Sequence, residues 1–517
     1  MRSVYLVLSI LAVLVLAPMA GLLSLSQLPG FEPQDLQFWQ SAYIRRVIFF
    51  SFWQALLSSL LSVIPAVLVA RAFAQYGDFP FRSLLLRLFG LPLVVPSVVA
   101  VLGIVSVYGS DGWIPLGRSL YGINGILLAH VFFNLPLAVR LLLPLWKAIP
   151  RHHWQLGEQM GFSQWHRWRY LEWPALREGL PGVLLLVFML CLTSFAVVLT
   201  LGGGPKSTTL EVAIYQSLRF DFDPAQAVML ALLQLFLCVM VAIVMLRLQK
   251  LPEVEIAVAS HASESTEYRS LLNGVVIIIA GIFVGLPLAS LLFEGLSGPL
   301  VRVVGNASIW RSAGITLMLG LAAALLSVTA GWFLLRGSSE LANQGRRGRA
   351  KLIELCGSVI YVVPPLVIGT GIFVLLSDHV NVFKWVYPVV ILVNAMMGLP
   401  FVIRTLGPAM RQNAMRYQYL CHSLALVGWN RFRFVDWPLL RRPVGLSAAL
   451  VAALAMGDLG VIALFGTPDT ATMPLLIYQQ LGAYRVQQAT VTALLLLGLC
   501  LLVFCGLERY IGGKVDA

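Results

Sequence analysis

The sequence is poor in charged residues, which make up only 11% of its 517 positions, with 23 Asp and Glu against 36 Lys and Arg. A soluble globular domain carries about 25% charged residues, so this composition excludes an ordinary soluble protein. Hydrophobic residues reach 59% of the chain, and the mean hydropathy is +0.85. The composition therefore predicts a membrane protein.

Groupings typical of catalytic and metal sites are also missing. The adjacent His152 and His153 have neither a carboxylate nor a second pair at zinc-ligand spacing, so we interpret them as polar loop residues and expect no metal. No nucleophile with a neighbouring base is visible, and we predict that the chain is not an enzyme. We expect no structural disulfide, because all six cysteines fall in predicted spans or on the predicted cytoplasmic side: Cys191, Cys238, Cys356, Cys421, Cys500 and Cys505.

A nucleotide-binding loop is absent as well. Residues 202–207 read Gly-Gly-Gly-Pro-Lys-Ser, which superficially resembles a phosphate-binding loop. Such a loop needs Gly directly before its Lys, whereas Pro205 precedes Lys206, and the segment falls on the predicted outer side. We therefore expect no cofactor in this chain.

Apolar runs long enough to cross a bilayer are abundant. A spanning helix needs about 20 apolar residues. The first run either remains as a helix or is a cleaved signal peptide, and its apolar length of about 22 residues favours a retained helix. We predict twelve spans, at residues 4–25, 47–71, 86–109, 123–145, 180–201, 226–247, 271–293, 312–335, 353–377, 385–404, 443–466 and 488–508.

The basic residues indicate the orientation of these spans. With the N-terminus inside, cytoplasmic segments hold 27 of the 36 Lys and Arg, and outer loops hold the other 9. Membrane proteins concentrate Lys and Arg on the cytoplasmic side, so we predict that both termini are cytoplasmic. The same bias accounts for the net charge of +13 without a nucleic-acid partner.

The chain also repeats itself at an offset of about 264 residues. Residues 165–174 align with residues 429–438, and Ile-Tyr-Gln at 214–216 aligns with Ile-Tyr-Gln at 477–479. Each half holds six predicted spans, so both halves enter the membrane in the same direction, with a path expected between them. The predicted fold is an all-α membrane protein of two tandem six-helix halves. The predicted parts are a first half at 1–247, a cytoplasmic linker at 248–270 and a second half at 271–517.

The long cytoplasmic segment of each half carries a recognisable pattern. These segments are the first coupling loop, residues 146–180, and the second coupling loop, residues 405–442. Both resemble the ATPase-coupling loop of binding-protein-dependent importers, in which Glu-Ala-Ala, three residues, Gly and nine residues precede Ile-x-Leu-Pro. Neither copy has the Glu-Ala-Ala triplet. The matching residues and their neighbours are Gln155, Leu156, Gly157, Glu158, Gly161, Leu171, Trp173 and Pro174 in the first loop, and Leu420, Cys421, His422, Ala425, Val435, Trp437 and Pro438 in the second.

This resemblance implies the permease of an ATP-binding-cassette importer, with the importer type I fold. Its partners would be two copies of a cytoplasmic ATPase that binds ATP and Mg, a periplasmic binding protein and membrane lipid. We expect short docking helices at 152–160 and 416–424, each ended by a tight turn at Gly161 or Ala425. Four arginines either anchor the loops at the membrane face or pair with acids of a partner: Arg167, Arg169, Arg431 and Arg433.

Nearly the whole chain is similar to the permeases of thiamine importers of Gram-negative bacteria. The similar stretches include residues 50–55, 125–136, 201–205, 223–225 and 464–466. Thiamine, with thiamine phosphates as further candidates, is therefore the implied solute, carried across the inner membrane. Two alternatives stay open. Ferric-ion permeases share the coupling loops, and an ion-coupled secondary transporter also has repeated halves, although it needs more intramembrane ionisable residues than this chain offers.

Few polar residues lie where a substrate path could run. Asp458 lies inside the eleventh predicted span, where an acid is costly and is a functional candidate; the other interpretation is a structural hydrogen bond at a helix break. Its counterpart in the first half is Ser194. Ser97, His130 and Asn134 are further candidates for the path, or else hydrogen-bond neighbouring helices.

Overall fold

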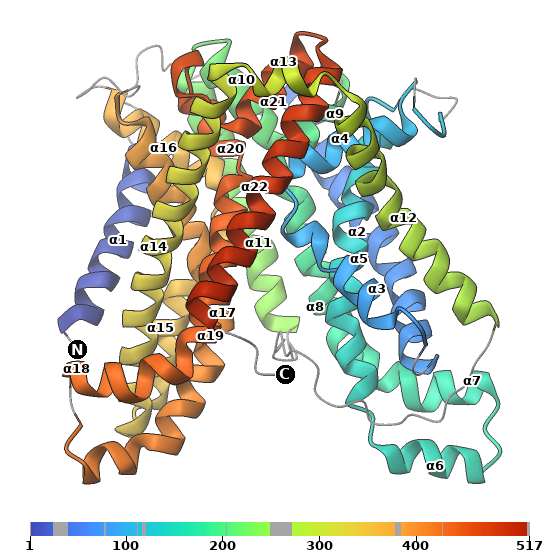
Figure 1. Ribbon diagram of the computed structural model, residues 1–517, viewed down its shortest axis with the longest axis vertical. Coiled ribbons are helices and arrows are strands. Elements are labelled where there is room, and N and C mark those ends of the chain that lie inside the picture. The colour runs from blue at the N-terminus through green and yellow to red at the C-terminus, as the bar shows by residue number, and fades with distance from the viewer. Residues whose placement is uncertain are drawn as a thin grey trace. The chain divides into compact units, whose positions relative to one another are not determined.

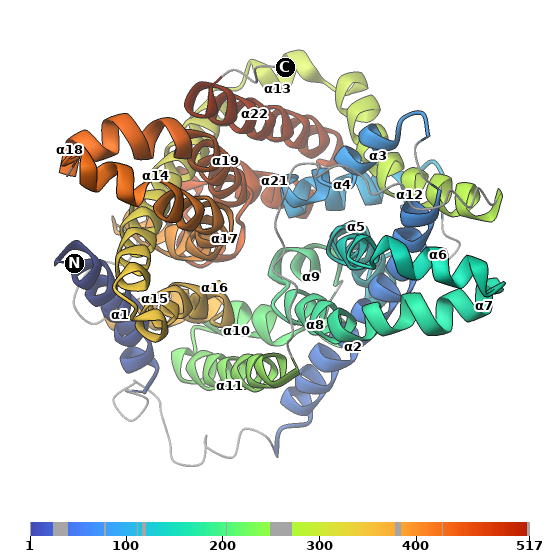
Figure 2. The same cartoon turned by 90° about the horizontal axis from the view of Figure 1, so that it is seen from below.

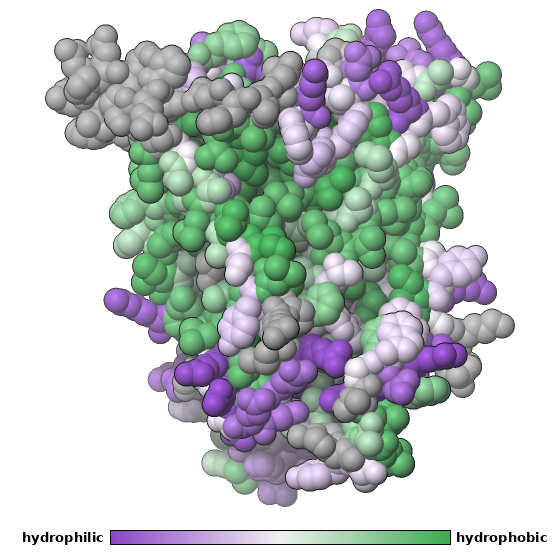
Figure 3. Space-filling model, turned by 90° about the vertical axis from the view of Figure 1, so that its left-hand side faces the viewer, coloured by the Kyte–Doolittle hydropathy of each residue, from purple (hydrophilic) through white to green (hydrophobic). Residues whose placement is uncertain are grey.

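The protein is helical wherever its structure is described, in agreement with the predicted all-α class. In the computed structural model, the described residues contain helices and no strand, as a bilayer requires of a chain that does not form a barrel. On the face in Figure 3, hydrophobic residues form a middle band, and hydrophilic residues gather at the two ends. The described residues are 2–23, 40–76, 79–110, 112–115, 120–202, 204–248, 271–377, 384–426 and 428–513.

The helices form two compact units. The first unit is Leu36–Ala213 with Phe236–Ser297, and the second is Met1–Asp35 with Ile214–Leu235 and Gly298–Ala517. Helices α10 (Leu210–Arg219) and α11 (Pro224–Leu248) are divided between them.

In the first unit, the long helix α2 packs against α5 and α8, and α12 packs against α4 and α2. Its helices include α2 (Ala42–Gln75), α3 (Arg82–Leu88), α4 (Ser97–Tyr108), α5 (Ile123–Lys147), α8 (Trp173–Leu192), α9 (Phe195–Leu201) and α12 (Leu271–Ser297).

In the second unit, α14 packs against α17 and α19, α22 packs against α19, and α1 packs against α16. Its helices include α1 (Arg2–Leu23), α13 (Leu300–Val304), α14 (Ala307–Asn343), α15 (Arg347–Val359), α16 (Pro365–Ser377), α17 (Val386–Ser423), α19 (Trp437–Met456), α20 (Gly460–Phe465), α21 (Met473–Gly482) and α22 (Val486–Gly512).

The first helix of each sequence half packs in the unit built mainly from the other half. Helix α1 lies beside α14 to α16 of the second unit, and α12 lies beside α3 and α4 of the first (Figures 1 and 2). Both crossings need glycine: a Cβ at Gly103 would lie 2.4 Å from the Pro287 carbonyl oxygen, and one at Gly371 would lie 2.4 Å from the Pro18 carbonyl oxygen. The compact units therefore differ from the predicted halves by an exchange of first helices and by Ile214–Leu235 of the first half, which belongs to the second unit. Residues 249–270, nearly all of the predicted linker, lie outside the described residues.

The predicted count of twelve spans is not confirmed. Among the described residues, ten helices are long and apolar enough to cross a membrane, and an eleventh span is counted if the pair Arg82–Leu93 and Ser97–Tyr108, bent by 114°, forms one span. The ninth predicted span instead contains a break before the short helix α16. Prolines explain both interruptions, because Pro96 and Pro364 stand at equivalent places and cannot continue a preceding helix.

Candidate functional site

The first coupling loop forms a helical hairpin at one end of its unit (Figure 1). Helix α6 (Arg151–Gln159) ends in a left-handed turn at Gly161, whose φ is +65°. The Phe162 amide then donates to the Gly157 carbonyl over 2.8 Å, the bond of a Schellman ending. Gly157 is buried, and a Cβ there would come within 3.1 Å of the Phe162 ring and 3.3 Å of Leu171. The turn and the close packing together fold the loop back on itself.

The chain then returns to the membrane through two short segments. Helix α7 (Gln164–Arg167) leads into a π-helix, η4 (Trp168–Glu172). Trp173 and Pro174 follow as the first residues of α8. Pro174 has no amide to donate, and it stands where the hydrogen-bonding pattern changes from the π-helix to α8.

The second coupling loop has the same ending but a different beginning. Ala425 has a φ of +51°, and the Leu426 amide donates to the Cys421 carbonyl over 2.8 Å. The tight turns predicted at Gly161 and Ala425 are therefore confirmed. The prediction of a separate helix at 416–424 is wrong, because α17 runs unbroken from Val386 to Ser423. The reason is local. Pro150 interrupts the helix in the first half, whereas the equivalent residue in the second half is Ala414, which lets the helix continue.

After its turn, the second coupling loop leads back to the membrane through the same kinds of segment as the first. Helix α18 (Gly428–Arg431) leads into a π-helix, η8 (Phe432–Asp436), and Trp437 and Pro438 then begin α19. Val435 is buried, as is Cys421. The side chain of His422 lies outside the described part of the chain.

Both loops expose apolar side chains among polar ones. Gln155 and Glu158 are exposed on α6. Clusters of exposed apolar residues at a polar end of a molecule mark contact surfaces for partners. The exposed apolar side chains include Leu156, Met160, Trp165 and Tyr170 in the first loop, and Tyr419, Leu420, Leu424, Trp429 and Phe434 in the second.

Each of the four predicted loop arginines contacts a residue of its own loop. The guanidinium of Arg169 lies 5.8 Å from the Tyr170 ring centroid, and that of Arg433 lies 5.7 Å from the Phe434 ring centroid. A loose ion pair of 3.9 Å joins Arg167 to Glu158. In the second loop, Arg431 Nε lies 3.6 Å from Oδ2 of a different acid, Asp436.

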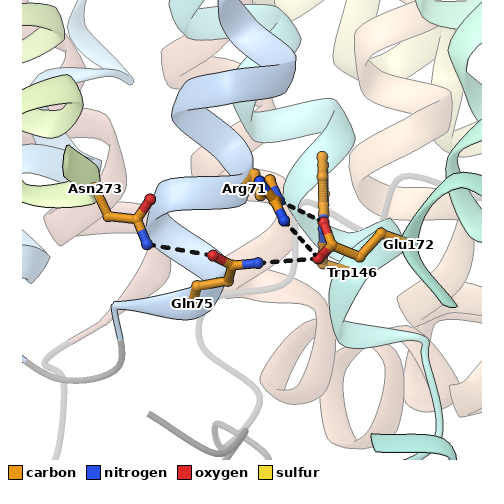
Figure 4. Close-up of polar contacts among 5 residues, drawn as sticks. All are labelled: Arg71, Gln75, Trp146, Glu172 and Asn273. Atoms are coloured by element: carbon orange, nitrogen blue, oxygen red, sulfur yellow. Dashed lines mark hydrogen bonds and ion pairs between the residues drawn. The ribbon is translucent and has the colours of Figure 1, made fainter. Parts of the chain in front are cut away.

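Sequence reasoning missed a buried carboxylate in the first coupling loop. The side chain of Glu172 is fully buried, and its two oxygens accept hydrogen bonds from Arg71, Gln75 and Trp146 (Figure 4). Gln75 in turn accepts a hydrogen bond from Asn273 of α12 over 3.2 Å. The only signal in the sequence was an acid, Glu172, repeated as Asp436 in the second half.

Two predicted path residues lie together inside the first unit. His130 and Asn134 lie one turn apart on α5, and both are buried. The His130 Nδ1 atom is 2.8 Å from Ser58 Oγ of α2, and the Asn134 amide donates to Cys191 Sγ of α8 over 3.3 Å. These contacts join three packed helices, which favours the interhelical interpretation.

Asp458, Ser194 and Ser97 all lie at breaks between helices. Asp458 precedes α20, and its Oδ1 accepts a hydrogen bond from the Gly460 amide over 3.0 Å. Its Oδ2 is buried and makes no further hydrogen bond of good geometry, although the Val461 amide and the Asn394 side chain lie close to the carboxylate. Ser194 takes the equivalent place before α9, and Ser97 is the first residue of α4. The contact to Gly460 supports a structural part for Asp458, and its place in a substrate path stays a prediction.

Within the described residues, no three His, Cys, Asp or Glu side chains come together as a metal site would require.

Comparison with known protein families adds a match in each half. Residues 66–251 and 339–515 match the family described as the binding-protein-dependent transport system inner membrane component. Each matched segment contains one coupling loop with its left-handed turn and its π-helix.

Curated relatives match over nearly the full length. The chain is 43% identical to a thiamine transport system permease protein of Brucella abortus, over 98% of this chain and 95% of that protein. It is 42% identical to the protein of the same name from Escherichia coli, over 93% and 92% of the two chains. The Haemophilus influenzae protein of that name is 37% identical, over 93% and 91%.

Proposed function

Because the chain belongs to the family of binding-protein-dependent transport system inner membrane components, we propose that it is the permease of an ATP-driven thiamine importer. As a membrane-spanning transport permease, the chain is not an enzyme. Its substrate moves from the periplasm to the cytoplasm across the bacterial inner membrane, and thiamine phosphates are further candidates.

One observation supports the energy-coupling part of this proposal: the chain carries two coupling loops that end in the same way, although they begin differently. In each loop, the helix that precedes the turn, α6 or the end of α17, is followed by a left-handed residue, a π-helix and a return to the membrane through Trp-Pro. Both expose apolar side chains for a protein partner. Two docking surfaces in one chain fit two copies of a cytoplasmic ATPase. ATP and Mg bind to these ATPase subunits and not to this chain.

The orientation is part of the same proposal. The coupling loops face the cytoplasm, as do both termini and residues 248–270, because this orientation places 27 of the 36 Lys and Arg on the cytoplasmic side. A periplasmic thiamine-binding protein delivers the substrate to the opposite face, and lipid surrounds the apolar band.

The substrate rests on the relatives, which are named as thiamine permeases and resemble this chain over nearly its full length. The test is uptake of labelled thiamine by bacteria that lack their own thiamine importer and express this chain with the ATPase and binding protein of its own organism. We expect uptake that excess thiamine abolishes and ferric ion leaves unchanged. Uptake of ferric ion instead of thiamine would contradict the substrate assignment, and uptake that persists without the ATPase would favour an ion-coupled transporter.

A further inference from the structure

Glu172 lies within the first coupling loop, yet most of its bonding partners lie outside that loop. We propose that Glu172 is a positioning residue, which fastens the first coupling loop to α2 and α12 so that a displacement of α6 is passed to these helices. This inference rests on the proposed function, because it concerns how movement driven by an ATPase reaches the membrane helices.

The bonding of the carboxylate is complete. Arg71 donates from Nε to Oε2 over 2.6 Å and from Nη2 to Oε1 over 3.1 Å. Gln75 donates to Oε1 over 2.9 Å, and Trp146 donates to Oε2 over 3.1 Å. A forked guanidinium pair fixes the angle between the elements that it joins as well as their distance. Glu172 therefore holds the loop to α2 in one orientation.

Two further contacts extend this attachment (Figure 4). The Gln75 side chain accepts from Asn273 of α12 over 3.2 Å, so the network reaches a third membrane helix. The Arg71 guanidinium also lies 5.3 Å from the Trp168 ring centroid, which brings the start of the π-helix into the same group. Single-turn π-helices often occur at functional sites.

The second half offers a contrast. Asp436 is the counterpart of Glu172, but its hydrogen bond from Asn413, of 3.2 Å, and its ion pair with Arg431 both come from within the second coupling loop. Arg336, the counterpart of Arg71, acts on Asp436 electrostatically and forms an ion pair with Glu340 of its own helix over 3.5 Å. The acid of the second loop thus bonds mainly to its own loop.

The backbone explains why the two loops need different attachments. The second coupling loop continues α17 without a break, so the helix itself transmits a displacement. The first is separated from α5 by a break at residues 148–150 before α6 begins. Movement at the ATPase-docking surface reaches the membrane helices only through an element whose position depends on both. In the first loop, the attachment through Glu172 supplies that connection.

The test compares Glu172→Gln with the matched control Asp436→Asn in liposomes that contain the permease with its ATPase, with thiamine-loaded binding protein added outside. The measured quantity is thiamine transported per ATP hydrolysed, which does not depend on the amount of folded protein. We expect this ratio to fall about fivefold or more for Glu172→Gln and to stay within about twofold of wild type for Asp436→Asn. In Glu172→Gln, the side chain keeps its shape but loses the ion pair with Arg71. Its NH2 group also faces N–H donors that the carboxylate accepted from.

A second variant separates coupling from stability. Replacing both charges, as in Arg71→Met with Glu172→Met, removes the buried pair without leaving one charge alone, which is often neutral for stability. We expect this double variant to restore thermal stability but not the transport ratio. A wild-type ratio in Glu172→Gln or in the double variant would overturn the proposal, as would an equal fall in Asp436→Asn. Absence of ATP-driven thiamine transport by the wild-type chain would instead overturn the proposed function.

Discussion

The left-handed turn at Gly161 allows a graded test of the first coupling loop. Gly161 has a φ of +65°, and a Cβ built there has no atom within 4 Å. A side chain at this position therefore meets no clash, and its cost is that of the backbone conformation alone. An L-residue in this region costs about 1–2 kcal/mol, and a β-branched residue costs more. Asparagine tolerates the region better.

These costs predict the order of a substitution series. A cost of 1–2 kcal/mol shifts a local equilibrium by a factor of about 5 to 30. If α6 must end in this turn to fit its ATPase, uptake and substrate-stimulated hydrolysis should decrease from Gly161 through Gly161→Asn and Gly161→Ala to Gly161→Val. The second coupling loop offers the reciprocal change, because Ala425→Gly removes a strain of about 1 kcal/mol and should preserve or raise stimulated hydrolysis.

The assay is ATP hydrolysis and uptake by reconstituted vesicles, with permease abundance measured alongside. We expect normal membrane insertion for every variant, because the turn lies outside the apolar helices. A Gly161→Val protein present in normal amount with normal stimulated hydrolysis would refute the coupling assignment of this loop. Equal losses for Gly161→Asn and Gly161→Val would show that backbone conformation is not the cause.

Three further predictions concern the acid at the helix break before α20, the topology and the assembly. Asp458→Asn should impair transport more than it lowers folded protein, because the amide oxygen can still accept from Gly460 while the charge is lost; equal losses would leave Asp458 a packing role. Single cysteines placed at Met160 or Leu424 should resist a membrane-impermeant thiol reagent added to intact cells, and strong labelling would overturn the orientation. Native mass measurement of the complex should find one permease chain with two ATPase subunits, whereas two permease chains would contradict the fused arrangement.

The sequence predicted the helical class well, because the apolar runs and the membrane leave few alternatives. It also located the turns at Gly161 and Ala425, since the family pattern marks that position in both halves. The exchange of α1 and α12 was not predicted, because a repeat reports which residues are equivalent and does not report which helices pack together. Gly103 and Gly371 were recognisable as a repeated pair, and the crossings with Pro287 and Pro18 explain them.

Two other features depend on information that a single sequence does not contain. Glu172 looked like an ordinary polar residue of a loop, because its partners on α2 lie 101 and 97 positions away in the chain. The extension of α17 into the second coupling loop was missed because a separate docking helix and a continued one have the same apolar periodicity. Only Ala414, in place of the proline at 150, distinguished the two cases.

The central claim is that this chain moves thiamine into the cytoplasm with energy delivered through its two coupling loops. The most direct measurement is accumulation of labelled thiamine in liposomes that contain the permease and its ATPase, with ATP inside and the binding protein outside. We predict accumulation against a gradient that requires both ATP and the binding protein, and that is lost when Gly161→Val is introduced. Accumulation that needs no ATP, or that Gly161→Val leaves unchanged, would contradict this account.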